Sequence, residues 1–221
     1  MKLFKTSRGN SALTLVDVVL SVAVIVFIMF VFLPAFLPRR RGAVGINCIS
    51  NLKQVDLAFR LWSGDNNDRY PMKYYTNEVG QALFLNAANS FLYFQVMSNE
   101  LSNLKVLVCP ADLKRSAATN FATDFNGTHL SYFVGMDASE EKPQSFLAGD
   151  SNITNAKTNN NGLMELTTNQ IVTWTSERHT GGGNIAMADG SVQQFSTSAL
   201  RLALQKTGFA TNRLLMPPAS Q

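Results

Sequence analysis

One uncharged apolar stretch constrains this chain more than any other feature. Between Val18 and Leu37 no side chain carries a charge, and about 20 such residues are enough for a helix to cross a bilayer. A single acid, Asp17, stands immediately before that stretch, inside the apolar run Ala12–Leu37. A carboxylate in hydrocarbon costs at least about 2.5 kcal/mol, so we expect Asp17 to have a partner. The sequence therefore predicts a membrane-spanning helix over residues 13–38.

A short basic segment, residues 1–12, precedes the apolar stretch. Its three cations favour a cytoplasmic N-terminus, whereas the arginine run at residues 39–41 opposes that orientation. A secretory signal peptide would carry its apolar core before the cleavage site and would lose it on cleavage. Here the processing point that we favour lies before the apolar run, so the mature chain would retain the helix.

Charge and cysteine content limit the partners and the compartment. Loss of the three cations of residues 1–12 would lower the formal charge from +4 to +1. A net charge so close to zero gives no electrostatic reason to expect that the mature chain binds nucleic acid. Cys48 and Cys109 are far apart in the chain, which fits one disulfide in an oxidising compartment and also fits two buried thiols.

An amphipathic helix is predicted to follow the membrane span over residues 39–63. Apolar side chains recur there at spacings of three or four and define one helical face: Ile49, Leu52, Val55, Phe59 and Trp62. Polar side chains occupy other angles and are expected to face solvent: Asn51, Lys53, Asp56 and Arg60. We expect the apolar face to pack against the domain that follows.

Downstream of the helix the pattern predicts a small α/β head. The run SGDNNDRYP is typical of a loop, and it lacks the Gly and distal Glu of a calcium-binding EF-hand. Residues 81–99 predict one or two short helices with a crowded aromatic face. Strands are predicted over residues 104–110, 129–135 and 144–150, and a long, exposed, Asn- and Thr-rich loop is expected to follow through Gly162.

A strong hairpin signal lies near the C-terminus. The segments IAMA and SVQQF flank Asp189 and Gly190, a dipeptide typical of a two-residue turn with positive φ at both central positions. We expect Asp189 to serve the turn and His179 to hydrogen-bond backbone groups of the adjacent glycine loop. The chain has one other histidine, no Gly-x-Ser-x-Gly motif and no zinc-ligand spacing. The sequence therefore predicts no catalytic residue, no metal and no cofactor.

The segment LTLVD resembles the processing site of the type IV pilin and type II secretion pseudopilin superfamily. In that family a prepilin peptidase removes a short basic leader and methylates the new N-terminus, and residue five of the mature chain is usually Glu. Alignment with the family's FTLIE implies cleavage between Ala12, where the family usually has Gly, and Leu13, where it usually has Phe. Asp17 then takes the place of the Glu, whereas a cut after Gly9 would put Thr14 there.

A second set of motifs resembles a large subfamily of pseudopilin-like proteins. That subfamily carries a His-x9-Asp-Gly motif associated with processing, a Cys followed by NLKQ, an Asp- and Asn-rich loop ending in Tyr-Pro, and a later Cys-Pro. The matching residues here are His179 with Asp189 and Gly190, Cys48 with Asn51–Gln54, Asp65–Pro71, and Cys109 with Pro110. The resemblance covers nearly the whole chain, and residues 72–107 and the Asn-rich loop carry little of it.

The resemblance implies an α+β, type IV pilin-like fold. Its long N-terminal helix would have a transmembrane half and an amphipathic half, packed on a small antiparallel β-sheet. The implied division is a leader at residues 1–12, the two helical halves, an exported head with a C-terminal β-hairpin at residues 64–215, and a tail at residues 216–221.

The resemblance also implies a structural subunit of a type II secretion-like or type IV pilus-like filament. Its partners would be the prepilin peptidase, like subunits, assembly-platform proteins and the inner membrane, with Asp17 acting in assembly. The head would lie in the periplasm or outside the cell. Two alternatives are a minor tip pilin that binds glycan or DNA through the Phe84–Phe94 region or the Asn-rich loop, and an envelope enzyme on a signal anchor. The missing nucleophile and base argue against the enzyme.

Overall fold

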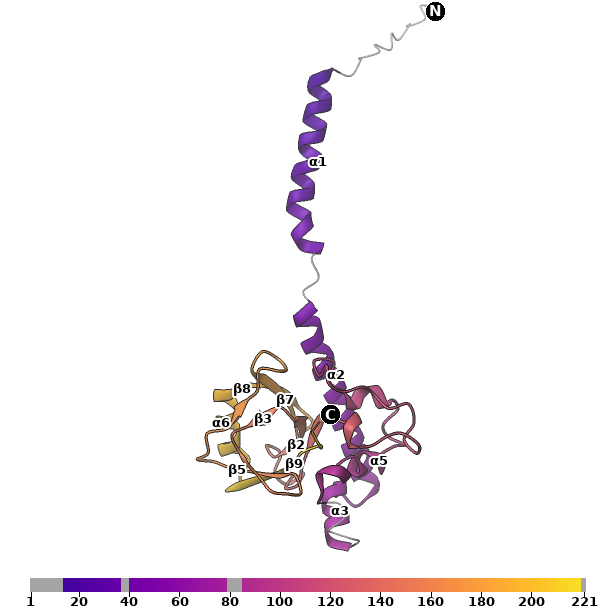
Figure 1. Cartoon of the computed structure of the whole chain (residues 1–221), viewed down its shortest axis with the longest axis vertical. Coiled ribbons are helices and arrows are strands. Elements are labelled where there is room, and N and C mark those ends of the chain that lie inside the picture. Colours follow the sequence, from indigo (N-terminus) through magenta and orange to yellow (C-terminus); the bar gives the residue numbers. More distant parts are fainter. Residues whose placement is uncertain (1–13, 37–39, 79–84, 220–221) are drawn as a thin grey trace, which may run out of the picture. The chain divides into compact units, whose positions relative to one another are not determined.

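The computed structural model describes residues 14–36, 40–78 and 85–219 (Figure 1). The chain divides into two compact units, Met1–Arg40 and Arg41–Gln221. The fold combines an N-terminal apolar helix with an α+β head built on an antiparallel sheet, as the sequence predicted in general terms.

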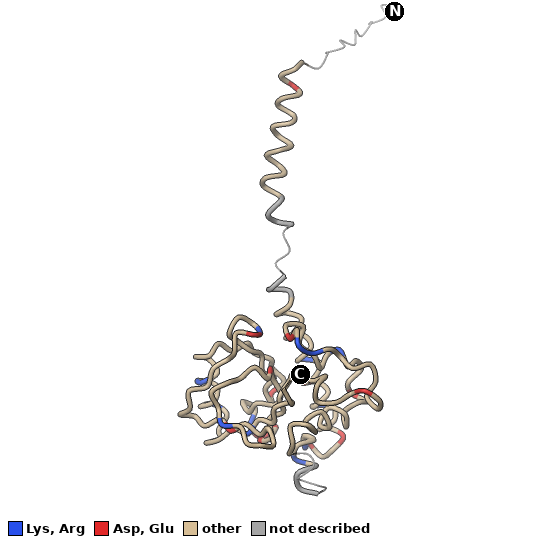
Figure 2. The backbone as a smooth tube through the Cα atoms, in the orientation of Figure 1, with Lys and Arg blue, Asp and Glu red and all other residues tan. Residues whose placement is uncertain are grey.

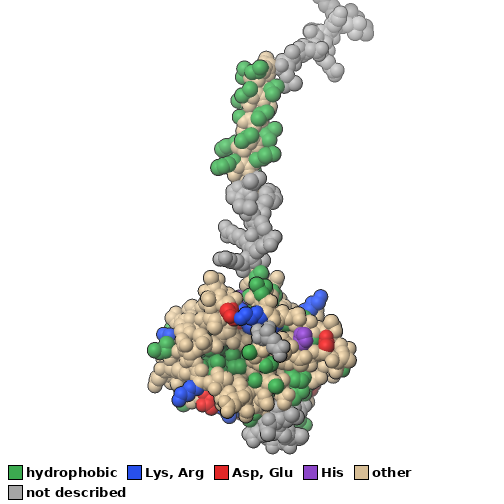
Figure 3. Space-filling view, in the orientation of Figure 1, with side chains coloured by type: hydrophobic (Ala, Val, Ile, Leu, Met, Phe, Trp, Pro, Cys, Tyr) green, Lys and Arg blue, Asp and Glu red, His purple; other side chains and the backbone are tan. Residues whose placement is uncertain are grey.

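The first unit contains α1 (Leu15–Phe36), which lies within the predicted span of residues 13–38. Its window Leu15–Phe32 has a mean hydropathy of 3.0 and is long and apolar enough to cross a membrane. No residue of that window is buried, and Figure 3 shows hydrophobic side chains along the visible face of this helix. Residues 37–39, where the two predicted halves of the N-terminal helix would meet, lie outside the described residues.

The second unit begins with most of α2 (Arg40–Asp65). The predicted apolar face is confirmed, because Leu52, Val55, Phe59 and Trp62 are buried and Ile49 is half-buried. The expectation that Asp56 faces solvent is wrong, since only 4% of this residue is exposed. A hairpin described below covers it.

The sheet of the head has seven strands in the order β4-β5-β9-β1-β2-β7-β8, and every neighbouring pair is antiparallel. Its strands are β1 (Tyr132–Gly135), β2 (Phe146–Asp150), β4 (Lys157–Thr158), β5 (Leu163–Thr167), β7 (Gly182–Met187), β8 (Val192–Ser196) and β9 (Thr211–Leu215). A separate pair joins β3 (Ile153–Thr154) to β6 (Thr173–Trp174). Strands β1 and β2 confirm two of the three predicted strands.

Two apolar cores lie on opposite faces of this sheet, because successive side chains of a strand point to opposite faces. In β1, Tyr132 and Val134 join the core that α2 shares with α5 (Leu92–Gln95), whereas Phe133 joins the other core. The second core includes Leu200 and Leu204 of α6 (Thr197–Lys206). The sheet is therefore covered on both faces, and Figure 1 shows α2 and α6 among the elements around it.

The remaining helices of the described part are short, and they replace one predicted strand. They are α3 (Pro71–Glu78), η1 (Ala87–Asn89), η2 (Leu104–Leu107) and η3 (Gly127–His129). The strand predicted over residues 104–110 is wrong, since η2 is a 3₁₀ helix whose N-cap Asn103 accepts a hydrogen bond from the Lys105 amide at 2.9 Å. A side chain that caps the first turn favours helix over strand.

Two further predictions need correction. The Asn- and Thr-rich loop contains the short strands β3 and β4. The predicted tail does not begin at residue 216, because the Met216 amide bonds the Gly162 carbonyl at 3.0 Å and Arg115 bonds the Pro218 carbonyl at 2.5 Å.

The predicted C-terminal hairpin exists as β7 and β8, but its turn is longer by one residue. The Met187 carbonyl accepts from the Gly190 amide at 3.0 Å, and the Met187 amide donates to the Ser191 carbonyl at 2.8 Å. In the turn only Gly190 has a positive φ, 87°, so the loop is the three-residue type that ends in one left-handed residue.

Candidate functional site

Asp17 lies in the first turn of α1 and forms a capping box with Thr14. Its Oδ2 accepts hydrogen bonds from the Thr14 amide at 3.0 Å and the Thr14 hydroxyl at 2.8 Å, while its own amide donates to Thr14 Oγ1 at 3.3 Å. This reciprocal pair satisfies amides that a helix start leaves open. Oδ1 has no partner among the described residues, and the acidic colour near the start of α1 in Figure 2 corresponds to this first turn.

A disulfide joins Cys48 of α2 to Cys109, which follows η2. Both residues are fully buried, and their Cα atoms lie 5.1 Å apart. Next to the bridge, Asn51 Nδ2 donates to the Val108 carbonyl at 3.2 Å. The helix and the head are thus joined by a covalent bond and a neighbouring hydrogen bond.

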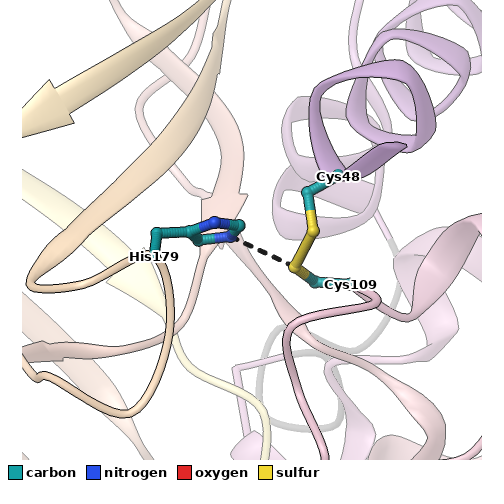
Figure 4. Close-up of side chains that lie close together, drawn as sticks. All are labelled: Cys48, Cys109 and His179. Atoms are coloured by element: carbon teal, nitrogen blue, oxygen red, sulfur yellow. Dashed lines mark hydrogen bonds between the residues drawn. A yellow bond between two sulfur atoms is a disulfide. The ribbon is translucent and has the colours of Figure 1, made fainter. Parts of the chain in front are cut away.

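His179 lies against this disulfide (Figure 4), and the expectation that it bonds backbone of the glycine loop is wrong. Its Nε2 lies 3.2 Å from Cys109 Sγ, 3.2 Å from Asp150 Oδ2 and 3.2 Å from Asn184 Nδ2. Only 3% of the His179 side chain is exposed. One ring nitrogen therefore faces a sulfur, an acceptor and a donor at once.

The backbone that carries His179 has an unusual conformation. His179, Thr180 and Gly181 have φ values of 49°, 57° and 81° in succession. Left-handed backbone costs a non-glycine residue about 1–2 kcal/mol, and it is especially unfavourable for a β-branched one such as threonine. Such outliers persist where neighbouring contacts hold them in place, and they cluster at functional sites.

An ion pair between buried groups holds the preceding residue. Arg178 pairs with Asp112, and its Nη1 donates to the Ser131 carbonyl at 3.0 Å. The Asp112 amide in turn donates to the Cys109 carbonyl at 2.8 Å. Two successive residues, Arg178 and His179, therefore contact the turn that follows η2, and this explains why the strained loop stays in place.

Asp150 supports His179 from the end of β2. Its side chain is fully buried, and Oδ2 accepts from the Asn184 amide at 2.8 Å and from Asn184 Nδ2 at 2.9 Å. Its Oδ1 is buried without a hydrogen-bond partner in the described part of the chain. A buried acid is uncommon unless it is paired, so the acid at the end of the apolar QSFLAGD run was the signal available for this residue.

The arrangement around His179 differs from a catalytic relay. In a relay, the orienting acid and the nucleophile bond opposite nitrogens of the imidazole. Here Asp150 and Cys109 face the same nitrogen, and Cys109 is in a disulfide. One potential ligand atom from each of Cys48, Cys109 and His179 lies within 4.8 Å of the others, and the two sulfurs are bonded to each other as a disulfide. The sequence spacing gave no sign of this cluster.

Asp189 and Gly190, at the other end of β7, contact α2. Asp189 Oδ1 accepts from the Ser191 amide at 2.8 Å and thus serves its turn. The Asp189 carbonyl accepts from Arg60 Nη1 at 3.1 Å, and a Cβ on Gly190 would lie 2.2 Å from the same nitrogen. The two ends of the His-x9-Asp-Gly motif therefore contact the Cys48–Cys109 bridge and Arg60 of α2.

Other predicted residues lie apart from this site. Ala12 and Leu13 are outside the described residues, as is Phe84. In the rest of the aromatic region, Tyr93 and Phe94 are buried and Phe91 is half-buried. Comparison of the chain with protein-family models, with curated proteins and with solved structures found no match in any of the three.

Proposed function

We propose that this chain is a pilin-like structural subunit, anchored in the inner membrane by α1 and assembled into an envelope filament through that helix. The observation that carries the proposal is the single carboxylate of Asp17 at the start of an otherwise uncharged, strongly apolar helix. In lipid such a carboxylate is costly unless it is paired, so lateral packing against a cationic group lowers its free energy.

The partner with the right charge is the free N-terminal amine of a like subunit. Cleavage between Ala12 and Leu13 by a prepilin peptidase would create that amine four residues before Asp17. The capping box occupies Oδ2 alone, which keeps Oδ1 available for a second chain. The buried disulfide supports an oxidising compartment for the head, outside the cytoplasm.

The test is replacement of Asp17 by Ala in the native host. We expect Asp17→Ala to enter the membrane normally, because it removes a charge from an apolar helix, and to be lost from the sheared filament fraction. Asp17→Glu retains a carboxylate and should restore assembly. The measurement is quantitative blotting of membrane and sheared fractions, with mass spectrometry of the N-terminus.

Thr14→Val is the matched control. It removes the hydroxyl of the capping box but keeps the carboxylate, so it separates helix capping from assembly. This variant should still enter filaments. Normal incorporation of Asp17→Ala, or an N-terminus at Met1 in the wild type, would contradict the proposed function.

A further inference from the structure

The Cys48–Cys109 bridge and His179 have a second possible state, in which the two cysteines are thiols. We propose that in this state Cys48, Cys109 and His179 bind Zn²⁺. Either a metal ion or a disulfide could then cross-link α2 to the head at the same place. The inference concerns the head alone and does not depend on filament assembly.

The donor set fits zinc. Thiolate and imidazole together select zinc over hard cations, and tetrahedral Zn–S and Zn–N bonds place donor atoms about 3.5–3.8 Å apart. The three donor atoms here already lie within 4.8 Å of one another, with Nε2 at 3.2 Å from Cys109 Sγ. Their Cα positions therefore need no large rearrangement to surround an ion.

The surroundings of Nε2 suit both states of the ring. Asp150 Oδ2 accepts a proton that Nε2 carries, whereas Asn184 Nδ2 donates to Nε2 when the proton is absent. Zn²⁺ binds the lone pair of neutral imidazole, so the ion would replace the Asn184 N–H at Nε2, and Asn184 Nδ2 would keep its hydrogen bond to Asp150 Oδ2.

Asp150 also places a negatively charged carboxylate near the position of the proposed ion. Its carboxylate lies 3.2 Å from the ligating nitrogen, and Oδ1 is buried without a partner among the described residues. An unpartnered buried carboxylate oxygen next to His179 is costly in the disulfide form, and a cation bound nearby would lower that cost. Asp150 therefore acts as a neighbouring negative charge, and the three ligands that we assign are Cys48, Cys109 and His179.

The strained loop gives an independent observation. Left-handed backbone at His179, Thr180 and Gly181 directs the imidazole to the sulfurs, and a histidine that only filled space would not need it. The Arg178–Asp112 ion pair holds this loop whether or not the cysteines are bonded, so the histidine stays in place when they separate.

The two states interconvert by balanced chemistry. A dithiol reductant cleaves the Cys48–Cys109 bond and becomes a disulfide itself, delivering two electrons and two protons to give two thiols. Zn²⁺ then displaces both thiol protons to solvent and takes the Nε2 lone pair. Oxidation by a disulfide-bearing oxidant reverses the first step and releases the ion.

The experiment uses the full chain in detergent, reduced with a phosphine under anaerobic conditions, and Co²⁺ as the spectroscopic probe. We expect the reduced chain to develop thiolate-to-cobalt charge-transfer absorption and the intense visible bands of a tetrahedral ion, and Zn²⁺ to abolish both. The oxidised chain should show neither. His179→Ala should weaken cobalt binding at least about tenfold.

His129→Ala is the matched control, since His129 bonds the Ser116 carbonyl on another part of the head and should leave the affinity unchanged. A reduced wild type without the charge-transfer band overturns the proposal, and so does equal affinity in the two histidine variants. Should His179→Ala fail to fold, X-ray absorption of the zinc-loaded wild type decides. It must show both sulfur and nitrogen scatterers, and a shell of one kind alone contradicts the site.

Discussion

Asp56 is a carboxylate on the buried side of α2, and the hairpin tip accounts for its burial. Arg60 lies on the same helix, Asp189 faces it from the hairpin, and Tyr70, which bonds the Ala188 carbonyl at 3.2 Å, lies nearby. Burial raises the pKa of Asp56 from 3.8 to about 6, the Asp189 charge adds to the rise, and Arg60 opposes it. The folded chain therefore holds this proton more tightly than the unfolded chain.

The sign of the pH dependence follows from that shift. Because the folded pKa lies above the ordinary value, the contribution of Asp56 to stability is greatest below pH 4, falls as pH rises to about 6, and stays low above it. Asp56→Asn should remove this slope, which amounts to at most about 3 kcal/mol at 1.36 kcal/mol per pKa unit. Urea unfolding of both chains between pH 4 and about 7 measures the difference.

An exposed acid on the same head provides the control for Asp56. Glu141→Gln changes the charge by the same amount without a buried site, so its unfolding curves should keep the wild-type slope. Parallel pH profiles for the wild type and Asp56→Asn would mean that Asp56 titrates as an ordinary carboxyl.

At the scale of elements, the two faces of α2 differ in their contribution to stability. Phe59 is fully buried, with ring centroids 6.3 Å from Tyr70 and 5.7 Å from Phe94. Leu57 lies on the same helix with 55% of its surface exposed. Phe59→Ala should lower the free energy of unfolding of the head by about 3–5 kcal/mol, whereas Leu57→Ala should stay within about 0.5 kcal/mol.

Denaturant unfolding, followed by a signal from the head such as tryptophan fluorescence, checks this pair of variants. Both substitutions remove a large apolar side chain from one helix, so a change in helix propensity is similar in the two. Equal losses of stability would show that α2 does not pack on the head through this face.

Local patterns predicted those elements whose signal is contained in a short segment. The apolar face of α2, the strands β1 and β2, and the hairpin β7–β8 all depend on spacing or turn chemistry within about fifteen residues. Strand β9 and helix α6 were missed although each has a local signal. Ser196 caps α6 through the Ala199 amide at 3.3 Å, and TNRLL alternates between buried and exposed residues over part of its length.

The site was harder to predict because its residues come from distant segments. Cys48, Cys109, Asp150 and His179 lie on four separate parts of the chain, and their proximity depends on the order of the strands. A resemblance singled out three of the four without giving them a common role. Asp150 was missed although it ends the apolar QSFLAGD run, since that local signal does not show which distant residues the acid contacts.

At the scale of the whole molecule, the disulfide closes a long loop in the unfolded chain. Cys48 and Cys109 are 61 residues apart, and in the loop-entropy account such a bridge stabilises by about 4 kcal/mol. The Cys48→Ala and Cys109→Ala double variant should therefore unfold at a markedly lower urea concentration than the oxidised wild type. Wild type that has been reduced in the presence of a chelator should resemble the variant, and a stability equal to that of the oxidised chain would contradict the entropic role.

The position of β9 has a consequence for how the protein is made. It pairs with β5 on one side and β1 on the other, and it follows every other strand of this sheet along the chain. The part of the sheet that holds β4 and β5 can therefore join the part that holds β1, β2, β7 and β8 only after β9 has been synthesised. A stop codon between Thr167 and Thr211 leaves β5 and β1 each with an open strand edge, and such edges can pair with strands of other chains.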